Sequence, residues 1–322
     1  ALLLVKTFTY GTADYQNLDA YFADRPISNY VLSFLFDTSV VNVLGVILGI
    51  LIPFAVGMVL YSINYGKTFA AYSSNSKALK FSQPNSTLNM LFKKEISTYA
   101  TTPAYIINTI IGPVVILVVS IFLCKMGYSG ICEYLDIQIS KDTVVGFIAL
   151  AFCLFCATAP ISACSISLEG KNMWLLKSSP INEKQLFSSK VCVHLCIVEP
   201  CILIGATLLS IFLQLNILQI AAIFILPTLA NFILAFAGVL INLWQPILDW
   251  DNETKVVKQS LSVLLTMVLG VLLAVAPYGI YKLCSTLPLY ATLLISIGLY
   301  VIVLVAAIAL LYTIGVKMFR KL

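Results

Sequence analysis

Seven long apolar stretches constrain this chain more than any other feature of its sequence. A helix that crosses a bilayer needs about 20 mostly apolar residues. Seven segments meet this requirement: 39–63, 105–124, 144–164, 191–213, 218–243, 259–280 and 288–316. They are apolar on all sides, whereas the strands of a membrane β-barrel alternate over about 10 residues. The sequence therefore predicts an all-α, polytopic integral membrane protein.

The composition excludes two broad classes of function. Of the 322 residues, 60% are hydrophobic and only 10% are charged, whereas soluble domains are about 25% charged. A soluble enzyme and a nucleic-acid-binding module do not fit this composition. We expect a lipid bilayer around the chain and no nucleic-acid partner.

The lysines and arginines predict how the spans are oriented. The loops alternate between the two sides of the membrane, and one side carries 14 of the 19 Lys and Arg residues. They are Lys67, Lys77, Lys80, Lys93, Lys94, Lys171, Lys177, Lys184, Lys190, Lys255, Lys258, Lys317, Arg320 and Lys321. The positive-inside rule places this side in the cytoplasm. We expect a multi-pass protein of the cell membrane with residues 1–38 outside and the C-terminus inside.

The ends of the first and last spans indicate an internal repeat. LYSINYGKTF at 60–69 and LYTIGVKMF at 311–319 align with one gap, although apolar helix ends followed by lysine often look alike. In the repeat interpretation, 39–67 is the last helix of a preceding half, 68–87 is a polar cytoplasmic linker and 88–322 is a half with six spans. The start at Ala1, with no signal-peptide pattern, predicts the C-terminal portion of a longer polypeptide.

Residues 88–102 are predicted to form an amphipathic helix at the membrane surface. One face is apolar and carries Leu88, Leu91, Phe92, Ile96 and Tyr99. The other face is polar and carries Lys93, Lys94, Glu95 and Ser97. This pattern is typical of a helix lying in the interface plane, or simply of the basic flank of the next span.

The loop at 166–190 is short, yet it contains a consecutive apolar run from Met173 to Leu176. Gly170 precedes this run, and Pro180 ends the predicted helix. Apolar side chains on a loop either dip into the lipid headgroups or insert into the groove of a partner.

Three segments in this order resemble the permeases of ABC exporters with the type V architecture. The loop at 166–190 is similar to the coupling-helix loop of that family, through Glu169, Gly170, Trp174, Leu175, Leu176, Pro180 and Lys190. Residues 92–113 resemble its connecting helix and first-span entry, through Lys93, Lys94, Glu95, Pro103, Tyr105, Asn108 and Gly112. Residues 242–260 resemble the second cytoplasmic loop of a bacterial subgroup, through Pro246, Asp249, Trp250, Asn252, Glu253, Val257, Lys258 and Gln259. Gly170 directly after Glu169 departs from the pattern and leaves the length of the coupling helix open.

The resemblance implies a permease subunit without its own ATPase site. ABC ATPase subunits would bind the ATP, and this chain would need no cofactor or metal. A second permease half, in the same longer chain or in a dimer partner, would complete the path. The implied contacts with the ATPase subunits are Glu169, Met173, Trp174, Leu175, Lys177, Asp249, Trp250 and Glu253.

Other motifs that carry chemistry are incomplete. Gly66-Lys67-Thr68 ends like a P-loop, but Tyr61 replaces the first glycine and no strand precedes the motif. Cys153 and Cys156 form a C-x-x-C without a second pair, and a disulfide between Cys124 and Cys132 is open. No catalytic site is predicted.

Polar residues inside the spans are candidates for the translocation path. An acid in a spanning helix usually faces a cavity or a partner, which applies to Glu199. Asn108 and Asn231 are further candidates for the path, although we expect them first to form hydrogen bonds between helices. His194 is five residues from Glu199, about 140° around a helix, so we expect it at the interface and not beside the acid. An ion-coupled carrier or channel that uses Glu199 is the alternative function, and a membrane scaffold is a third.

Overall fold

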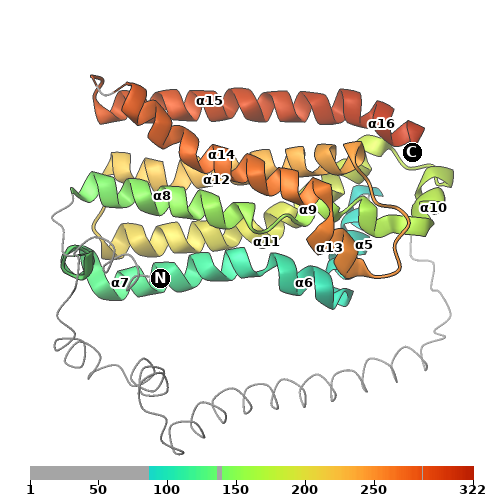
Figure 1. Ribbon diagram of the computed structural model, residues 1–322, viewed down its shortest axis with the longest axis horizontal. Coiled ribbons are helices and arrows are strands. Elements are labelled where there is room, and N and C mark those ends of the chain that lie inside the picture. The colour runs from blue at the N-terminus through green and yellow to red at the C-terminus, as the bar shows by residue number, and fades with distance from the viewer. Residues whose placement is uncertain (1–86, 136–139, 285) are drawn as a thin grey trace, which may run out of the picture. The chain divides into compact units, whose positions relative to one another are not determined.

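The computed structural model describes residues 87–135, 140–284 and 286–322, which form one helical bundle (Figure 1). No strand occurs among these residues. The predicted span at 39–63, the segment before it and the linker up to residue 86 lie outside the described part of the chain, as does the P-loop-like motif.

Six apolar helical segments of the described part are long enough to cross a membrane. The first and second are Pro103–Glu133, formed by α6 (Pro103–Thr109) and α7 (Ile111–Leu135), and Lys141–Ser178, which begins with α8 (Lys141–Ala157). The third and fourth are α11 (Glu183–Phe212) and α12 (Ile217–Trp244). The fifth and sixth are Glu253–Leu283, which contains α14 (Leu261–Leu283), and Leu289–Lys321, which begins with α15 (Leu289–Leu310). Each coincides with one of the six spans predicted after residue 88. The fold class is therefore confirmed as an all-α, multi-pass membrane protein, while the total of seven spans stays a prediction.

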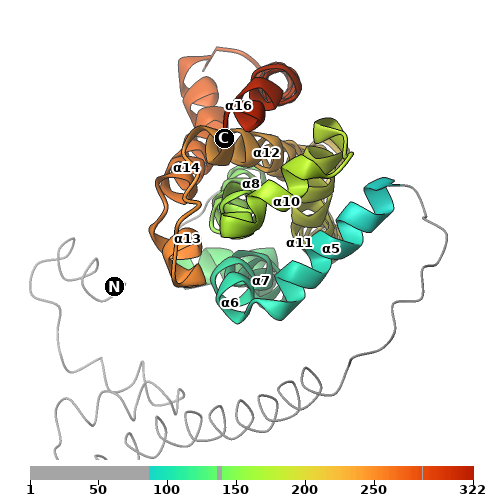
Figure 2. The same cartoon turned by 90° about the vertical axis from the view of Figure 1, so that its right-hand side faces the viewer.

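Seven shorter elements complete the described part. They are α5 (Thr87–Thr101), α9 (Ile161–Cys164), the 3₁₀-helix η2 (Ser167–Asn172), α10 (Met173–Ser178), α13 (Glu253–Gln259), the π-helical turn η3 (Leu311–Gly315) and α16 (Val316–Lys321). α5, α10, α13 and α16 gather at one end of the bundle, which we call the loop end (Figures 1 and 2). The opposite end carries the short α11–α12 and α14–α15 turns, and we call it the hairpin end (Figure 1).

Polar caps fix where several helices begin. The side chains of Ser140, Asn182, Asn252 and Ser260 each accept a backbone N–H from the first turn of the helix that follows. Asn216 and Gln219 form a reciprocal capping box at the start of α12. These caps satisfy N–H groups that have no partner within the helix, so the apolar runs start as helices at defined residues.

Helices α8 and α12 form the centre of the bundle. Their apolar windows are 61% and 50% buried, against 17% for the last span, and α8 lies in the middle of the end view (Figure 2). Small residues allow this close packing: a Cβ on Gly270 of α14 would lie 2.2 Å from the Cβ of Ala157. Such small-residue contacts are typical of helix packing in membranes.

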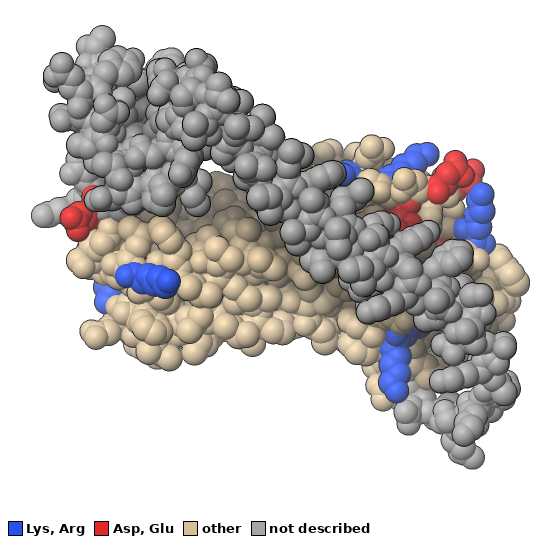
Figure 3. All heavy atoms as spheres, turned by 90° about the horizontal axis from the view of Figure 1, so that it is seen from below, with Lys and Arg blue, Asp and Glu red and all other residues tan. Residues whose placement is uncertain are grey.

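The basic residues of the described part are unequally divided between the two ends. Lys125, Lys141 and Lys282 lie at the hairpin end, whereas the other 11 lie at the loop end. On the face drawn in Figure 3, coloured side chains lie near the two ends, and the part of the band between them that is visible as described residues is uncharged. An uncharged band between two charged ends is the pattern that a bilayer requires.

Candidate functional site

The loop end brings together all three segments that the sequence singled out. α5 carries 88–101, η2 and α10 carry the 166–178 loop, and the 245–259 segment contains α13. Figure 2 looks onto this end and shows α10 between α5 and α13. The close approach of these segments makes the loop end the candidate functional site.

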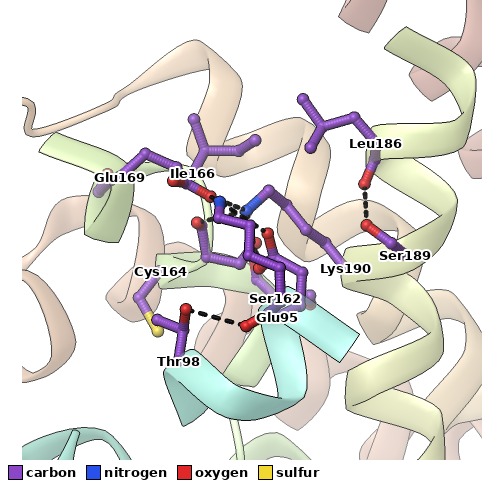
Figure 4. Close-up of polar contacts among 12 residues, drawn as sticks. Glu95, Thr98, Ser162, Cys164, Ile166, Glu169, Leu186, Ser189 and Lys190 are labelled. Carbon is purple, nitrogen blue, oxygen red and sulfur yellow. Dashed lines mark hydrogen bonds and ion pairs between the residues drawn. The ribbon is translucent and has the colours of Figure 1, made fainter. Parts of the chain in front are cut away.

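A buried ion cluster fastens these elements together (Figure 4). The Nζ atom of Lys190, on α11, lies 2.9 Å from Glu95 Oε2 on α5 and 2.9 Å from Glu169 Oε1 on η2. It also donates to the Ser165 carbonyl at 2.9 Å. Lys94 reaches Glu169 Oε1 at 2.5 Å. Two lysines and two glutamates give a neutral cluster, which is what buried charges require.

Three of the four side chains are shielded from solvent, whereas Lys94, at 40% exposure, closes the cluster at the surface. The side chain of Lys190 is 0% exposed, and those of Glu95 and Glu169 are 8% and 11% exposed. Burying an ion costs several kcal/mol unless it is paired and hydrogen-bonded. Moving α5, η2 or α11 relative to the other two would therefore leave a buried charge unpaired.

The predicted helix at 88–102 is confirmed as α5. The prediction that Glu95 lies on the polar, exposed face of this helix was wrong. Leu91, Glu95 and Tyr99 form the buried face of α5. They follow a four-residue spacing, so they lie on one side of a helix. The carboxylate is buried because Lys190 neutralises it, which the sequence alone did not show.

Two tyrosines fix the bend between α5 and α6. The hydroxyls of Tyr99 and Thr109 share a hydrogen bond of 3.0 Å, and the Tyr105 hydroxyl donates to the Ile161 carbonyl at 2.6 Å. Burial raises the pKa of Tyr99, although the bond to Thr109 opposes this effect. The Tyr99 hydroxyl therefore stays neutral, and these bonds hold α5 at a fixed angle to α6.

Asn242, at the end of α12, ties the 166–178 loop to the bundle. Its Oδ1 accepts the backbone N–H groups of Ile166 at 2.8 Å and Ser167 at 3.0 Å. Its Nδ2 donates to the hydroxyls of Ser167 at 2.8 Å and Ser262 at 3.0 Å. Asn242 thus satisfies backbone groups that have no helical partner, and it joins α12, η2 and α14.

Trp250 joins the two loops of this end to each other. Its indole Nε1 donates to the Ser167 carbonyl at 2.8 Å. Gly170 lies against the ring, and a Cβ there would be 2.9 Å from Nε1. The φ of Gly170 is +50°, a conformation that favours glycine. The backbone turns at this glycine within η2, so the regular helix of this loop is only α10, Met173–Ser178.

The eight residues implied as ATPase contacts divide between the inside and the surface of the loop end. Met173 is buried in the core, and Glu169 and Trp250 are bonded within the bundle. Trp174 and Leu175 are 67% and 54% exposed. Lys177 and Asp249 are also exposed, and Glu253 is half-buried in the first turn of α13. The open surface is therefore centred on Trp174 and Leu175. Lys171 and Asp249, two exposed residues of the same end, form an ion pair at 3.4 Å.

A second polar group lies inside the bundle and joins three helical segments. Glu199 of α11 accepts from Thr228 Oγ1 at 2.7 Å and from Asn231 Nδ2 at 2.8 Å, both on α12. Asn231 Oδ1 lies 3.0 Å from His194 Nε2. His194 Nδ1 accepts the Ser162 backbone N–H of α9 at 3.3 Å. The interhelical hydrogen bonds expected for Asn231 are confirmed.

The directions of these hydrogen bonds determine the protonation state of the His194 ring. Because Asn231 gives its amide N–H to Glu199, its oxygen is left to accept the Nε2–H of His194. The Ser162 N–H requires an unprotonated Nδ1, so the ring is neutral with its proton on Nε2. His194 is fully buried, and its expected position at the interface was wrong. Asn231 of the neighbouring helix bridges the angle that separates it from Glu199.

Asn108 does not belong to either polar group. Its amide donates to the Ala104 carbonyl of its own helix at 2.6 Å, so the expected bond between helices does not form. Within the described residues no cluster of His, Cys, Asp and Glu could hold a metal ion. Cys153 and Cys156 are buried, and Cys124 and Cys132 are not joined by a disulfide.

Comparison of the chain with protein-family models, with curated proteins and with solved structures found no match. The function is therefore argued from the loop end, the polar group and the charges described above.

Proposed function

We propose that this chain is the membrane-spanning subunit of an ATP-driven ABC transporter, most simply an exporter of the cell membrane. The observation that supports the proposal is the exposure of Trp174 and Leu175 on α10, at 67% and 54%. The elements around α10 are fixed by the buried ion pairs of Lys190. A short helix with an exposed aromatic anchor suits the groove of a partner. The excess of lysine and arginine at the loop end supports a cytoplasmic position, where ATPase subunits are found.

The contacts of α10 would transmit a push from such a partner into the spans. Met173 packs into the core behind the exposed pair. Glu169, just before α10, is paired with Lys190 at the start of α11 and with Lys94 on α5. The ATPase subunits would hydrolyse ATP, and this chain would bind them and form the path. In this proposal the ATP site belongs to the ATPase subunits and not to this chain.

The test is co-purification of the intact chain from membranes of the cells that make it. We expect a polypeptide with a Walker motif and ATP hydrolysis in the eluate, and we expect both to be lost with Trp174→Ala plus Leu175→Ala. Ile211→Ala plus Phe212→Ala is the matched control, since these side chains are 65% and 61% exposed but lie at the hairpin end of α11. Equal recovery of the ATPase with the double variant would contradict the proposal.

An ion-coupled carrier is the second candidate, because Glu199, Asn231 and His194 form a continuous polar chain. This candidate needs no ATPase and can be tested with the chain alone in proteoliposomes. A proton flux that a pH-sensitive dye detects, and that Glu199→Gln abolishes, would favour the carrier. Our proposal predicts no such flux.

A further inference from the structure

A cavity of about 390 Å³ lies at the hairpin end, at the other end of the bundle from Trp174 and Leu175. It is formed by the first halves of α8, α12 and α15 and the last part of α14. Small-molecule sites have volumes of about 300–1,000 Å³, so this cavity has the size of a ligand site. No role in the proposed function accounts for it.

The cavity has an apolar interior and a polar rim. Leu150, Leu226 and Leu293 belong to its interior. Three tyrosines stand at the outer side, Tyr278, Tyr281 and Tyr290, and about half of each side chain is exposed. This division matches a molecule that has an apolar tail and a polar head.

The charge of the rim indicates the sign of the head group. Asp142 is the one charged side chain among the described residues that line the cavity. Gln219 Nε2 donates to its Oδ1 at 2.7 Å, which holds the carboxylate in place. No ion pair involves Asp142 within the described part of the chain.

The nearest basic side chains have other partners. Lys141 Nζ donates to the Gln214 carbonyl at 2.9 Å. Lys282 Nζ lies 5.8 Å from the centroid of the Tyr278 ring, within the range of a cation–π contact, so Tyr281 and Tyr290 are the rim tyrosines left for a ligand. An anionic head would meet the carboxylate of Asp142, whereas a cationic head would neutralise it.

We propose that this cavity binds a cationic amphipath: a molecule with an ammonium or quaternary ammonium head at Asp142, Tyr281 and Tyr290, and an alkyl tail in the interior. Binding does not require an ATPase, so this inference stands or falls separately from the proposed function.

The probe is radiolabelled decyltrimethylammonium, with the intact chain in nanodiscs of an uncharged glycolipid and no ATPase added. Empty nanodiscs give the background. We expect saturable binding that unlabelled decyltrimethylammonium displaces and decyl sulfate does not. Binding no greater than the background, or equal displacement by decyl sulfate, would overturn the proposal.

Asp142→Asn tests the site with little change in shape. Removing one rim-exposed charge is expected to weaken binding about fivefold. Asp251→Asn, an exposed position at the loop end, is the matched control and should leave binding unchanged. Ala222→Trp places a large side chain in the cavity and should abolish binding, with gel filtration to verify folding. Unchanged binding in both cavity variants would overturn the proposal.

A further binding experiment distinguishes a bilayer lipid from a free molecule as the ligand. The nanodiscs then contain phosphatidylethanolamine, whose head group carries an ammonium. Competition by this lipid would assign the cavity to a bilayer lipid, whereas unchanged binding of the probe would assign it to a free cationic amphipath.

Discussion

At the loop end the polar side chains are bonded to one another, whereas at the hairpin end several of them surround open space. Lys190, Glu95 and Glu169 form ion pairs from three different elements, and Trp174 and Leu175 remain exposed around them. Asp142 and three tyrosines instead line a cavity. The comparison teaches that one end is suited to transmit a displacement and the other to hold a molecule.

The largest expected effect comes from removing the cation at the centre of the loop end. Lys190→Met leaves Glu95 and Glu169 buried without their shared partner, so we expect the free energy of unfolding to fall by about 3–5 kcal/mol. Thermal unfolding of the purified chain measures this change. Adding Glu95→Gln and Glu169→Gln should restore much of the lost stability, because the buried charges are removed.

Lys184→Met is the control for that prediction, since Lys184 is exposed on the same helix. It should change stability by less than about 0.5 kcal/mol. Similar losses from both lysine variants would mean that the ion cluster does not stabilise the loop end.

A pair of glycine variants in α14 tests whether packing loosens toward the hairpin end. Gly270 lies against Ala157, and a Cβ there would be 3.0 Å from the Ala157 Cα. We expect Gly270→Ala to cost about 1–3 kcal/mol through overpacking. Gly279 has nothing within 4 Å of an added Cβ, so Gly279→Ala should stabilise the helix slightly. Chemical unfolding measures the free energy of unfolding of both variants. Equal changes in the two variants would contradict looser packing toward the hairpin end.

Asn231→Leu separates the polar group inside the bundle from the ion cluster. It removes the bonds to Glu199 and His194, and hydrogen bonds between membrane helices average about 0.6 kcal/mol. We therefore expect a loss of about 1 kcal/mol in the same unfolding assay, and about half of that for Thr228→Val. A loss as large as that of Lys190→Met would place the critical polar contacts in the middle of the bundle.

The smallest effect on stability is expected at the exposed pair. Trp174→Ala plus Leu175→Ala removes no buried contact of these two side chains, so the melting temperature should stay within a few degrees of the original. The same variant is expected to lose the ATPase partner. A large fall in melting temperature would indicate that the pair packs inside the protein.

Much of the fold could be predicted because a spanning helix is a local pattern. Each apolar run of about 20 residues after residue 88 became helical, although the run at 144–164 is broken between α8 and α9 and the run at 105–124 is divided between α6 and α7. Polar caps such as Asn216 mark several of the starts. The short helix around Trp174 was also visible, because Gly170 and Pro180 bound it.

The contacts of the candidate site could not be predicted in the same way. Glu95 and Lys190 are 95 residues apart, and no local pattern pairs them. A lysine next to an apolar run, such as Lys190, is typical of the end of a spanning helix, so the sequence gives no sign that it is buried in an ion pair. Asn242 and the bridge from Glu199 through Asn231 to His194 depend on how α9, α11 and α12 pack, which spacing within one helix does not determine.

Site-specific photocrosslinking at position 174 tests the central claim most directly. A photoreactive phenylalanine analogue replaces Trp174 in the intact chain, the membranes are irradiated and the adducts are identified by mass spectrometry. Our account predicts a crosslink to a polypeptide that contains a nucleotide-binding motif. Adducts formed only with lipid would contradict it.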